Sequence, residues 1–273
     1  MVKDGTMPLT LDEALEIRAR ERVTPYAGGT DLMINPEENA NYLFINKIPD
    51  MKKIVADEET IRIGAACTFT DVIENELTPG ILREAAEMVG APAIRNFGTI
   101  GGNLCNGSPK ADSALAFFAA GAKLRLLSSK GERVLPIKDF YIGRNKTALR
   151  EDELLVEILM PKTGIEHYYF KKVGTRNALA ISRVSFAAVI RIENQKILDL
   201  RTAFGAVSDV IICREDLDGM LVHKTVEEAK AVKEDYLATY DKAIVPIRGR
   251  VSSEYRKTVC MNLLRDFLET NGI

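Results

Sequence analysis

The sequence predicts a mixed helical and β-sheet protein with one large or two modest domains. Its 273 residues are enough for a substantial core, because a domain commonly contains about 150 residues. Hydrophobic residues make up 46% of the chain and charged residues 28%, as in ordinary soluble globular proteins. Segments with helical spacing and segments with strand-like alternation both occur along the chain. We therefore expect both helices and sheets in the fold.

The N-terminal third begins with a helix signal. Thr10 and Glu13 have the spacing of a capping box, and apolar residues follow, so a short helix is expected after Thr10. Asn35-Pro36 stops regular structure, which leaves at most one helical turn after the glycine pair at residues 28–29. The other expected elements here are strands over 23–27 and 60–66 and a brief helix from 69 to 77.

The middle of the chain has two marked helices around a glycine-dense segment. Pro79 and Gly90 bracket the first helix in the positions typical of a helix start and end. The second helix, over residues 111–122, is so apolar that it must be mostly buried. Residues 94–109 between them are rich in Gly, Thr, Asn and Ser, and we expect a rigid loop there.

The C-terminal third predicts a small sheet with two helices. Residues 161–164, Pro-Lys-Thr-Gly, are the expected domain boundary. Glu193, Asn194 and Gln195 separate two β-rich runs and predict a hairpin. Before this boundary, strand-like composition is found over 124–127 and 154–160. Beyond it, strand-like composition is found over 184–192 and 197–207, and helical spacing over 225–240 and 252–268.

Charge and composition exclude several classes of protein. Thirty-seven Lys and Arg residues against 39 Asp and Glu residues give a net charge of −2, so we expect no nucleic-acid partner. No stretch approaches the roughly 20 apolar residues that span a bilayer, and residues 1–13 resemble neither a signal nor a transit peptide, so a cytoplasmic protein without membrane attachment is expected. The 4 cysteines are scattered, and only His167 and His223 are histidines, which argues against a metal site.

Two glycine-rich loops, residues 27–32 and 98–103, are the candidate binding elements. Glycine has no Cβ, so successive N–H groups can converge on an anion, and two such loops could grip one pyrophosphate. Neither contains GxGxxG, and the GxxxxG spacing from Gly102 to Gly107 lacks the lysine of a P-loop. The alternative is that each loop is only a tight turn.

Several blocks together resemble a known family. Ala-Gly-Gly-Thr-Asp-Leu at 27–32, the block at 94–104, Ser-Pro-Lys-Ala-Asp at 108–112, and residues 172–176 resemble the FAD-binding medium subunit of the molybdenum hydroxylases. This family includes xanthine, carbon monoxide and nicotinate dehydrogenases. The resemblance implies an α+β fold, with a vanillyl-alcohol-oxidase-type FAD-binding domain of two subdomains over 1–161. A small C-terminal α+β domain of the CO-dehydrogenase flavoprotein type is implied over 165–273.

The resemblance also implies the cofactor and the residues that bind it. FAD is expected to be noncovalent, with its pyrophosphate wrapped by the two glycine-rich loops, largely through main-chain N–H groups. Asp112 would bind a sugar hydroxyl, Leu155 would contact the flavin, and Lys172 would lie near the isoalloxazine edge. The implied cofactor-binding residues are Ala27, Gly28, Gly29, Thr30, Asp31, Leu32, Thr99, Ile100, Gly101, Gly102, Asn103, Asn106, Ser108, Asp112, Leu155 and Lys172. On the residues alone, Asp112 could instead be a first-turn helix carboxylate, and Lys172 could be one of a solvated lysine pair.

The implied function is electron transfer. The chain would take electrons from a [2Fe–2S] partner subunit and reduce NAD⁺ or another acceptor, as in xanthine dehydrogenase. Molybdopterin and [2Fe–2S] would be held only by partner subunits, because this chain has no cysteine-rich module for a cluster. No catalytic side chain and no metal ligand are expected. The alternatives are a stand-alone FAD-dependent reductase or oxidase, and an inert scaffold subunit without flavin.

Overall fold

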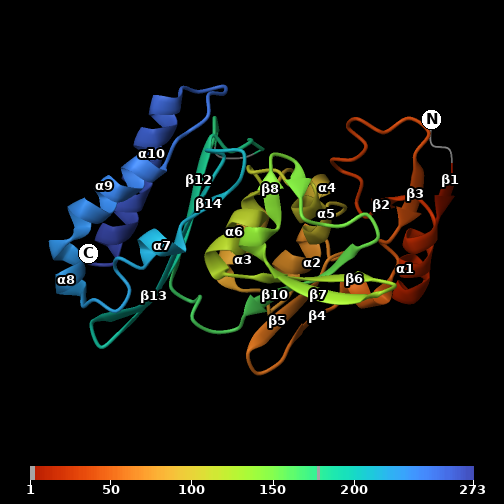
Figure 1. Cartoon of the computed structure of the whole chain (residues 1–273), viewed down its shortest axis with the longest axis horizontal. Coiled ribbons are helices and arrows are strands. Elements are labelled where there is room, and N and C mark those ends of the chain that lie inside the picture. Colours follow the sequence, from red (N-terminus) through yellow and green to blue (C-terminus); the bar gives the residue numbers. More distant parts are fainter. Residues whose placement is uncertain (1–3, 177–178) are drawn as a thin grey trace. The chain divides into compact units, whose positions relative to one another are not determined.

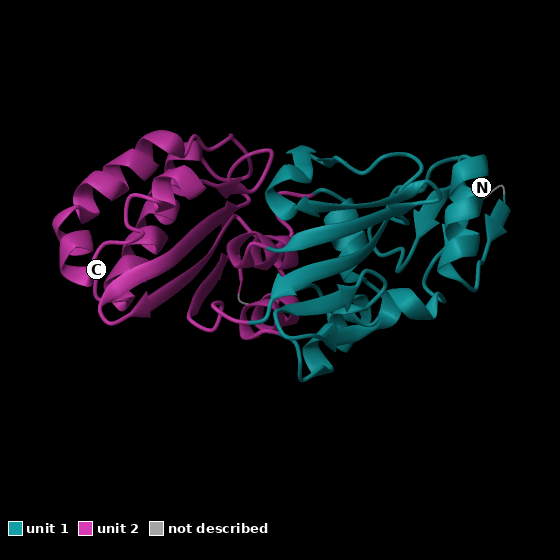
Figure 2. Cartoon of the chain, turned by 60° about the horizontal axis from the view of Figure 1, so that its bottom comes forward, with its two compact units in different colours: residues 1–78, 89–107, 122–162 teal, residues 79–88, 108–121, 163–273 magenta. Residues whose placement is uncertain are grey.

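The computed structural model describes residues 4–176 and 179–273, whose elements form two compact units that interleave along the chain (Figures 1 and 2). Unit 1 contains residues 1–78, 89–107 and 122–162, and unit 2 contains residues 79–88, 108–121 and 163–273. Two helices from the middle of the chain, α3 (Gly80–Glu87) and α6 (Asp112–Ala120), therefore belong to unit 2. The division of the chain into two contiguous domains, residues 1–161 and 165–273, stays a prediction.

Unit 1 begins with a three-stranded parallel sheet. Its strand order is β1 (Asp4–Thr6), β3 (Asn41–Phe44), β2 (Thr24–Tyr26). The predicted first helix is confirmed as α1 (Leu11–Arg20), and the Thr10 side chain accepts the N–H of Glu13 at 3.2 Å. The Glu13 carboxylate accepts from the N–H of Leu9 at 2.9 Å, one residue before the position that a capping box uses.

The second sheet of unit 1 is antiparallel and has five strands. Their order is β4 (Ile54–Ala56), β5 (Thr60–Gly64), β10 (Leu154–Pro161), β6 (Lys123–Ser128), β7 (Gly131–Pro136). The short elements of the unit are the helices α2 (Phe69–Glu74), α4 (Pro92–Arg95) and α5 (Ile100–Cys105), the 3₁₀ turns Pro49–Lys52 and Ile137–Asp139, and the hairpin β8 (Tyr141–Gly143) and β9 (Lys146–Thr147). Strand β10 lies in the centre of this sheet, with partners on both sides.

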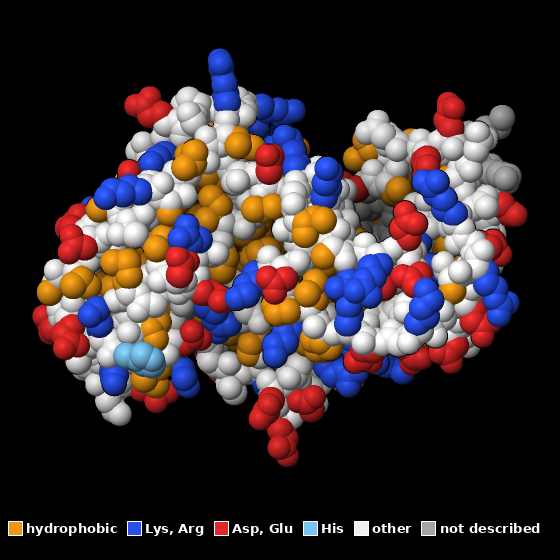
Figure 3. Space-filling model, viewed as in Figure 1, with side chains coloured by type: hydrophobic (Ala, Val, Ile, Leu, Met, Phe, Trp, Pro, Cys, Tyr) orange, Lys and Arg blue, Asp and Glu red, His pale blue; other side chains and the backbone are white. Residues whose placement is uncertain are grey.

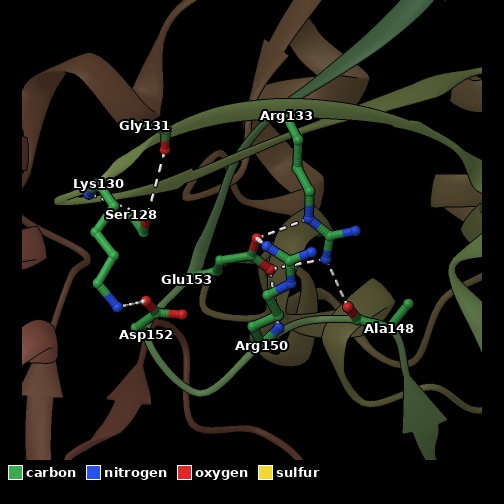
Figure 4. A network of polar contacts seen from close by, with 8 residues as sticks. All are labelled: Ser128, Lys130, Gly131, Arg133, Ala148, Arg150, Asp152 and Glu153. Carbon is green, nitrogen blue, oxygen red and sulfur yellow. Dashed lines mark hydrogen bonds and ion pairs between the residues drawn. The ribbon is translucent and has the colours of Figure 1, made fainter.

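The start of β10 is fixed by a buried carboxylate (Figure 4). Glu153 is 4% exposed and accepts from the Arg133 guanidinium at 2.7 and 2.8 Å and from the N–H of Arg150 at 2.9 Å. Its main-chain oxygen accepts from Arg18 at 2.8 Å. Burial alone would raise the pKa of Glu153, but the hydrogen bonds from Arg133 and Arg150 hold this pKa below its ordinary value. The ionised carboxylate thus anchors the strand that carries Leu155.

Unit 2 is an antiparallel sheet with helices on both faces (Figure 1). Its strand order is β11 (Tyr168–Val173), β12 (Val184–Glu193), β13 (Lys196–Gly205), β14 (Ile212–Cys213). Its other helices are α7 (Glu215–Asp218), α8 (Val226–Ala231), α9 (Lys233–Ala243) and α10 (Ser253–Thr270). Phe186 of β12 packs on Phe267 of α10 with ring centroids 5.9 Å apart, while α6 packs on β12 and β13. Both faces of β12 are therefore buried, which explains its long apolar run.

Two predictions for this unit are confirmed. All nine residues of α6 are buried, as its apolar composition indicated. The hairpin between β12 and β13 turns at Asn194 and Gln195, whose φ angles are 49° and 62°. Consecutive positive φ angles are typical of the two-residue turn that matches the twist of antiparallel strands.

A second buried carboxylate lies in the core of unit 2. Asp218 is 1% exposed and accepts from the N–H of Thr202 at 2.8 Å and from the hydroxyls of Tyr236 and Tyr240 at 2.8 and 2.7 Å. Burial is the dominant influence and raises the pKa of Asp218 to about 6, although these hydrogen bonds oppose the change. The folded chain therefore holds a proton on Asp218 over a pH range in which the unfolded chain has released it.

This proton makes stability depend on pH. Below pH 3.8, the ordinary pKa of an aspartate, Asp218 is protonated in both states; as pH rises toward 6, only the unfolded state loses the proton, so stability falls. Relative to Asp218→Asn, the wild type should lose about 3 kcal/mol of unfolding free energy across this range. Urea unfolding at several pH values measures this difference, with Asp209→Asn as an exposed control. A difference that stays constant with pH would show that Asp218 titrates normally.

The surface carries charges of both signs. On the face seen in Figure 3, Lys and Arg side chains are interspersed with Asp and Glu side chains. Over residues 4–176 and 179–273, no helix combines the length and apolar character needed to cross a bilayer.

Candidate cofactor-binding site

The first glycine-rich loop lies at the carboxyl edge of the parallel sheet in unit 1. Residues 27–32 follow β2, and β3 runs parallel to β2, so the two strands end at the same edge. Ligands of open parallel sheets commonly bind at this edge. Gly29 has φ +71°, a backbone conformation that favours glycine, and its carbonyl accepts the N–H of Met33 at 2.9 Å. This closes the single turn that the sequence predicted.

The N–H groups of this loop are available to a ligand. Those of residues 28–32 have no hydrogen-bond partner within the described part of the chain. Asp31 is exposed, and the other residues from 27 to 32 are half-buried. A half-buried run of unpaired N–H groups is the arrangement that binds an anion such as a phosphate.

The second glycine-rich segment is arranged differently from the prediction. Residues 100–105 form the short helix α5, N-capped by Thr99, rather than a loop. The N–H groups of Ile100 and Gly101 donate to the carbonyls of Cys67 and Ala65 at 3.0 and 2.8 Å. Those of Gly102 and Asn103 donate to Thr99, at 3.1 and 3.0 Å. These four N–H groups are therefore engaged within unit 1, whereas those of residues 28–32 have no partner among the described residues.

The two segments nevertheless lie side by side. A Cβ added to Gly28 would lie 1.8 Å from the carbonyl oxygen of Phe97, so the two backbones are in direct contact. The side chain of Asn106 donates to the carboxylate of Asp31 at 3.0 Å. The structure thus brings residues 27–32 together with the segment that leads into α5.

The two glycines of α5 have different surroundings. A Cβ on Gly101 would lie 2.6 Å from both Cβ and the carbonyl oxygen of Ala65, so this glycine is required by packing. Gly102 is exposed, and a Cβ there would meet only the Thr99 hydroxyl, at 2.8 Å. Within residues 4–176 and 179–273, no neighbouring element fills the space beside Gly102, and this open backbone surface fits the close approach of a cofactor.

Two other predicted binding residues, Leu155 and Ser108, have surroundings that do not indicate a ligand. Leu155 is buried and lies opposite Leu126 in the sheet, beside the irregularity between residues 155 and 157 of β10. Ser108 belongs to unit 2 and accepts the N–H of Lys110 at 3.3 Å. Neither has a contact here that assigns it a ligand.

The predicted residues Asp112 and Lys172 form an ion pair in unit 2. Their N–O distance is 2.7 Å, and the exposed fractions of the lysine and aspartate side chains are 12% and 7%. Lys172 also donates to the carbonyl of Met88 at 2.9 Å, and Ser182 donates to the other Asp112 oxygen at 2.7 Å. Burial raises the pKa of Asp112, and Lys172 and Ser182 oppose this change. Reading Lys172 as half of a solvated pair is therefore wrong.

Ser182 contacts a predicted site residue, but the sequence analysis did not identify it. Nothing in the sequence around Ser182 singles it out, because its role comes from contact with a residue 70 positions away.

Burial raises the pKa of the Cys105 thiol to about 12, so the thiol stays protonated at neutral pH, as a space-filling cysteine does. Over the described ranges 4–176 and 179–273, no group of three or more His, Cys, Asp or Glu side chains could hold a metal ion.

Comparisons with known proteins identify the class to which this fold and site belong. Residues 4–163 match the model of the FAD binding domain in molybdopterin dehydrogenase, and residues 168–271 match the CO dehydrogenase flavoprotein C-terminal domain. The chain therefore carries an FAD-binding domain, and the predicted α+β fold with its two named parts is confirmed. Unit 1, with its free N–H groups and the open surface at Gly102, fits this cofactor.

Similar proteins narrow the class. The chain is 36% identical over 211 residues to the xanthine dehydrogenase FAD-binding subunit of Escherichia coli O157:H7, covering 73% of this chain and 72% of that protein. It is 32% identical over 201 residues to the nicotinate dehydrogenase FAD-subunit of Eubacterium barkeri, covering 68% of each. The carbon monoxide dehydrogenase of Hydrogenophaga pseudoflava superposes with a TM-score of 0.89, at 23% identity over 97% of this chain and 96% of that one. The chain belongs to the FAD-binding medium subunits of the molybdenum hydroxylase family.

Proposed function

We propose that this chain is the electron-transfer subunit of a xanthine-dehydrogenase-like molybdenum hydroxylase. It receives electrons from a [2Fe–2S] partner subunit and passes them to NAD⁺ or another acceptor, while a third subunit holds molybdopterin. The observation that carries the proposal is the loop of residues 28–32, whose unpaired N–H groups lie at the carboxyl edge of a parallel sheet. The names of the relatives, which are subunits or medium chains of dehydrogenases, support the assembly with partners.

The protein's contribution is to bind and orient the cofactor. Bound FAD supplies the redox chemistry, accepting electrons and passing them on. Residues 27–32 hold the pyrophosphate through main-chain N–H groups, and the open backbone at Gly102 allows its close approach. The remaining proposed cofactor-binding residues are Thr99, Ile100, Gly101, Asn103, Asn106, Ser108, Asp112, Leu155 and Lys172. No side chain acts as an acid or base.

An absorption spectrum of the purified chain tests this function. The protein should be yellow, and mass spectrometry of the released cofactor should identify FAD. Anaerobic NADH should bleach the spectrum if NAD⁺ is the physiological acceptor, and an iron–sulfur subunit should co-purify with the chain from its native host. A colourless chain that takes up no added FAD would contradict the proposal. Turnover of an organic substrate without any partner subunit would instead favour a stand-alone flavoenzyme.

A further inference from the structure

Tyr26 places a hydroxyl group directly beneath the loop of residues 27–32. It is the last residue of β2, and the hydroxyl end of its ring lies against Gly29 of the loop. A Cβ added to Gly29 would lie 2.1 Å from the Tyr26 hydroxyl oxygen and 2.4 Å from Cζ. The hydroxyl therefore occupies the space that a side chain at position 29 would fill.

The ring of Tyr26 is held by its aromatic neighbours. Its centroid lies 5.0 Å from that of Phe44 and 5.6 Å from that of Tyr42, in tilted and edge-on arrangements. Phe44 is also the direct partner of Tyr26 in the parallel sheet. Because these contacts fix the ring, the hydroxyl is oriented before any ligand arrives, which lowers the entropic cost of using it.

The Tyr26 hydroxyl is available to donate a hydrogen bond to a ligand. Within the ranges 4–176 and 179–273, Tyr26 has ring contacts but no hydrogen-bond partner, and it is only half-buried. The N–H groups of residues 28–32 are unpaired in the same loop. One phenol O–H beside these N–H groups adds a side-chain donor to a set that otherwise consists of main-chain groups.

We propose that Tyr26 is a further binding residue of the FAD site and donates a hydrogen bond from its hydroxyl to a pyrophosphate oxygen. The inference rests on the proposed role of residues 27–32 in holding that group. A hydrogen bond to a charged acceptor is stronger than one between neutral groups. Loss of the hydroxyl should therefore weaken FAD binding roughly tenfold or more.

The chain offers a matched control for this test. Tyr42 lies next to Tyr26 and is 2% exposed, and its buried hydroxyl has no hydrogen-bond partner among the described residues. Tyr42→Phe therefore removes the same atom from the same aromatic cluster without removing a hydrogen bond. Tyr26→Phe and Tyr42→Phe should both keep the thermal unfolding temperature of the wild-type chain without flavin.

The experiment measures binding of FAD, ADP and riboflavin to the flavin-stripped full chain, together with the rate of FAD release. Tyr26→Phe should weaken FAD and ADP by a similar factor and leave riboflavin unchanged, because riboflavin has no phosphate. Tyr42→Phe should leave all three unchanged. If Tyr26→Phe binds FAD as tightly as the wild type, or if both variants lose FAD affinity equally, the role of Tyr26 is overturned while the proposed function is not. A wild-type chain that binds neither FAD nor ADP overturns the proposed function as well.

Discussion

Replacing Asp112 with alanine is expected to lower the free energy of unfolding by about 3–5 kcal/mol. The reason is that Lys172, whose side chain is only 12% exposed in the wild type, would lose its carboxylate and keep the carbonyl of Met88 as its acceptor. An ammonium group left without its carboxylate in such a site pays the desolvation cost without the compensating attraction. Urea unfolding of the flavin-free chain measures the loss.

A double substitution separates the ion pair from its surroundings. Asp112→Leu combined with Lys172→Met removes both charges, and apolar replacement of a buried pair is often neutral or stabilising. The double variant should therefore regain most of the stability that Asp112→Ala loses. It should still retain less FAD than the wild type if the two residues also bind the cofactor, as proposed. A double variant as unstable as the single one would show that the pair's charge is not the cause.

Some of the fold follows from local sequence, since composition and turn chemistry act over a few residues. The apolar run that became α6 is buried because it has no polar face to expose, and that property is visible in the sequence itself. The turn at residues 193–195 was equally readable, because Asn and Gln at its centre interrupt two β-rich runs. Both predictions depend on signals that tertiary packing reinforces.

Other elements depend on partners that are remote in the sequence. Strand β7 is an edge strand without a buried residue, so it lacks the apolar alternation that predicts a strand and forms by pairing with β6. Helix α5 was expected to be a loop because of its two glycines. The N–H groups of its first two residues instead bond to the carbonyls of Cys67 and Ala65, and Gly101 packs closely on Ala65. Tertiary contacts here outweigh the low helix propensity of glycine.

The candidate site also combines features that local sequence predicts with features that depend on remote contacts. The hypothesis that residues 27–32 bind an anion could be formed from the sequence, because it depends on main-chain N–H groups and on the glycines that expose them. The pairing of Asp112 with Lys172, 60 positions apart, and the role of Ser182 were not. Such contacts arise from packing α6 against the sheet of unit 2, and no local pattern encodes them.

Gly28→Ala should abolish FAD retention, weakening it by about 100-fold or more. The added Cβ would lie 1.8 Å from the carbonyl oxygen of Phe97 and 3.0 Å from Cα of Gly98. Both neighbours are backbone atoms, so no side chain can rotate away, and the two segments must move apart. That movement would redirect the N–H groups of residues 28–32, and we expect an overpacking cost of about 1–3 kcal/mol in stability.

The choice of glycine decides whether such an experiment can separate binding from folding. Gly101→Val would force its side chain into Ala65, 2.6 Å away, and would damage the packing of α5 along with any cofactor site. Gly143→Ala is the matched control, because its nearest neighbour, Cδ of Lys146, would be 3.7 Å away. After gel filtration, Gly143→Ala should keep the FAD content of the wild type while a folded Gly28→Ala loses it. Full FAD content in Gly28→Ala would mean that the pyrophosphate is held elsewhere, since the loop proposed to hold it would have been displaced without consequence.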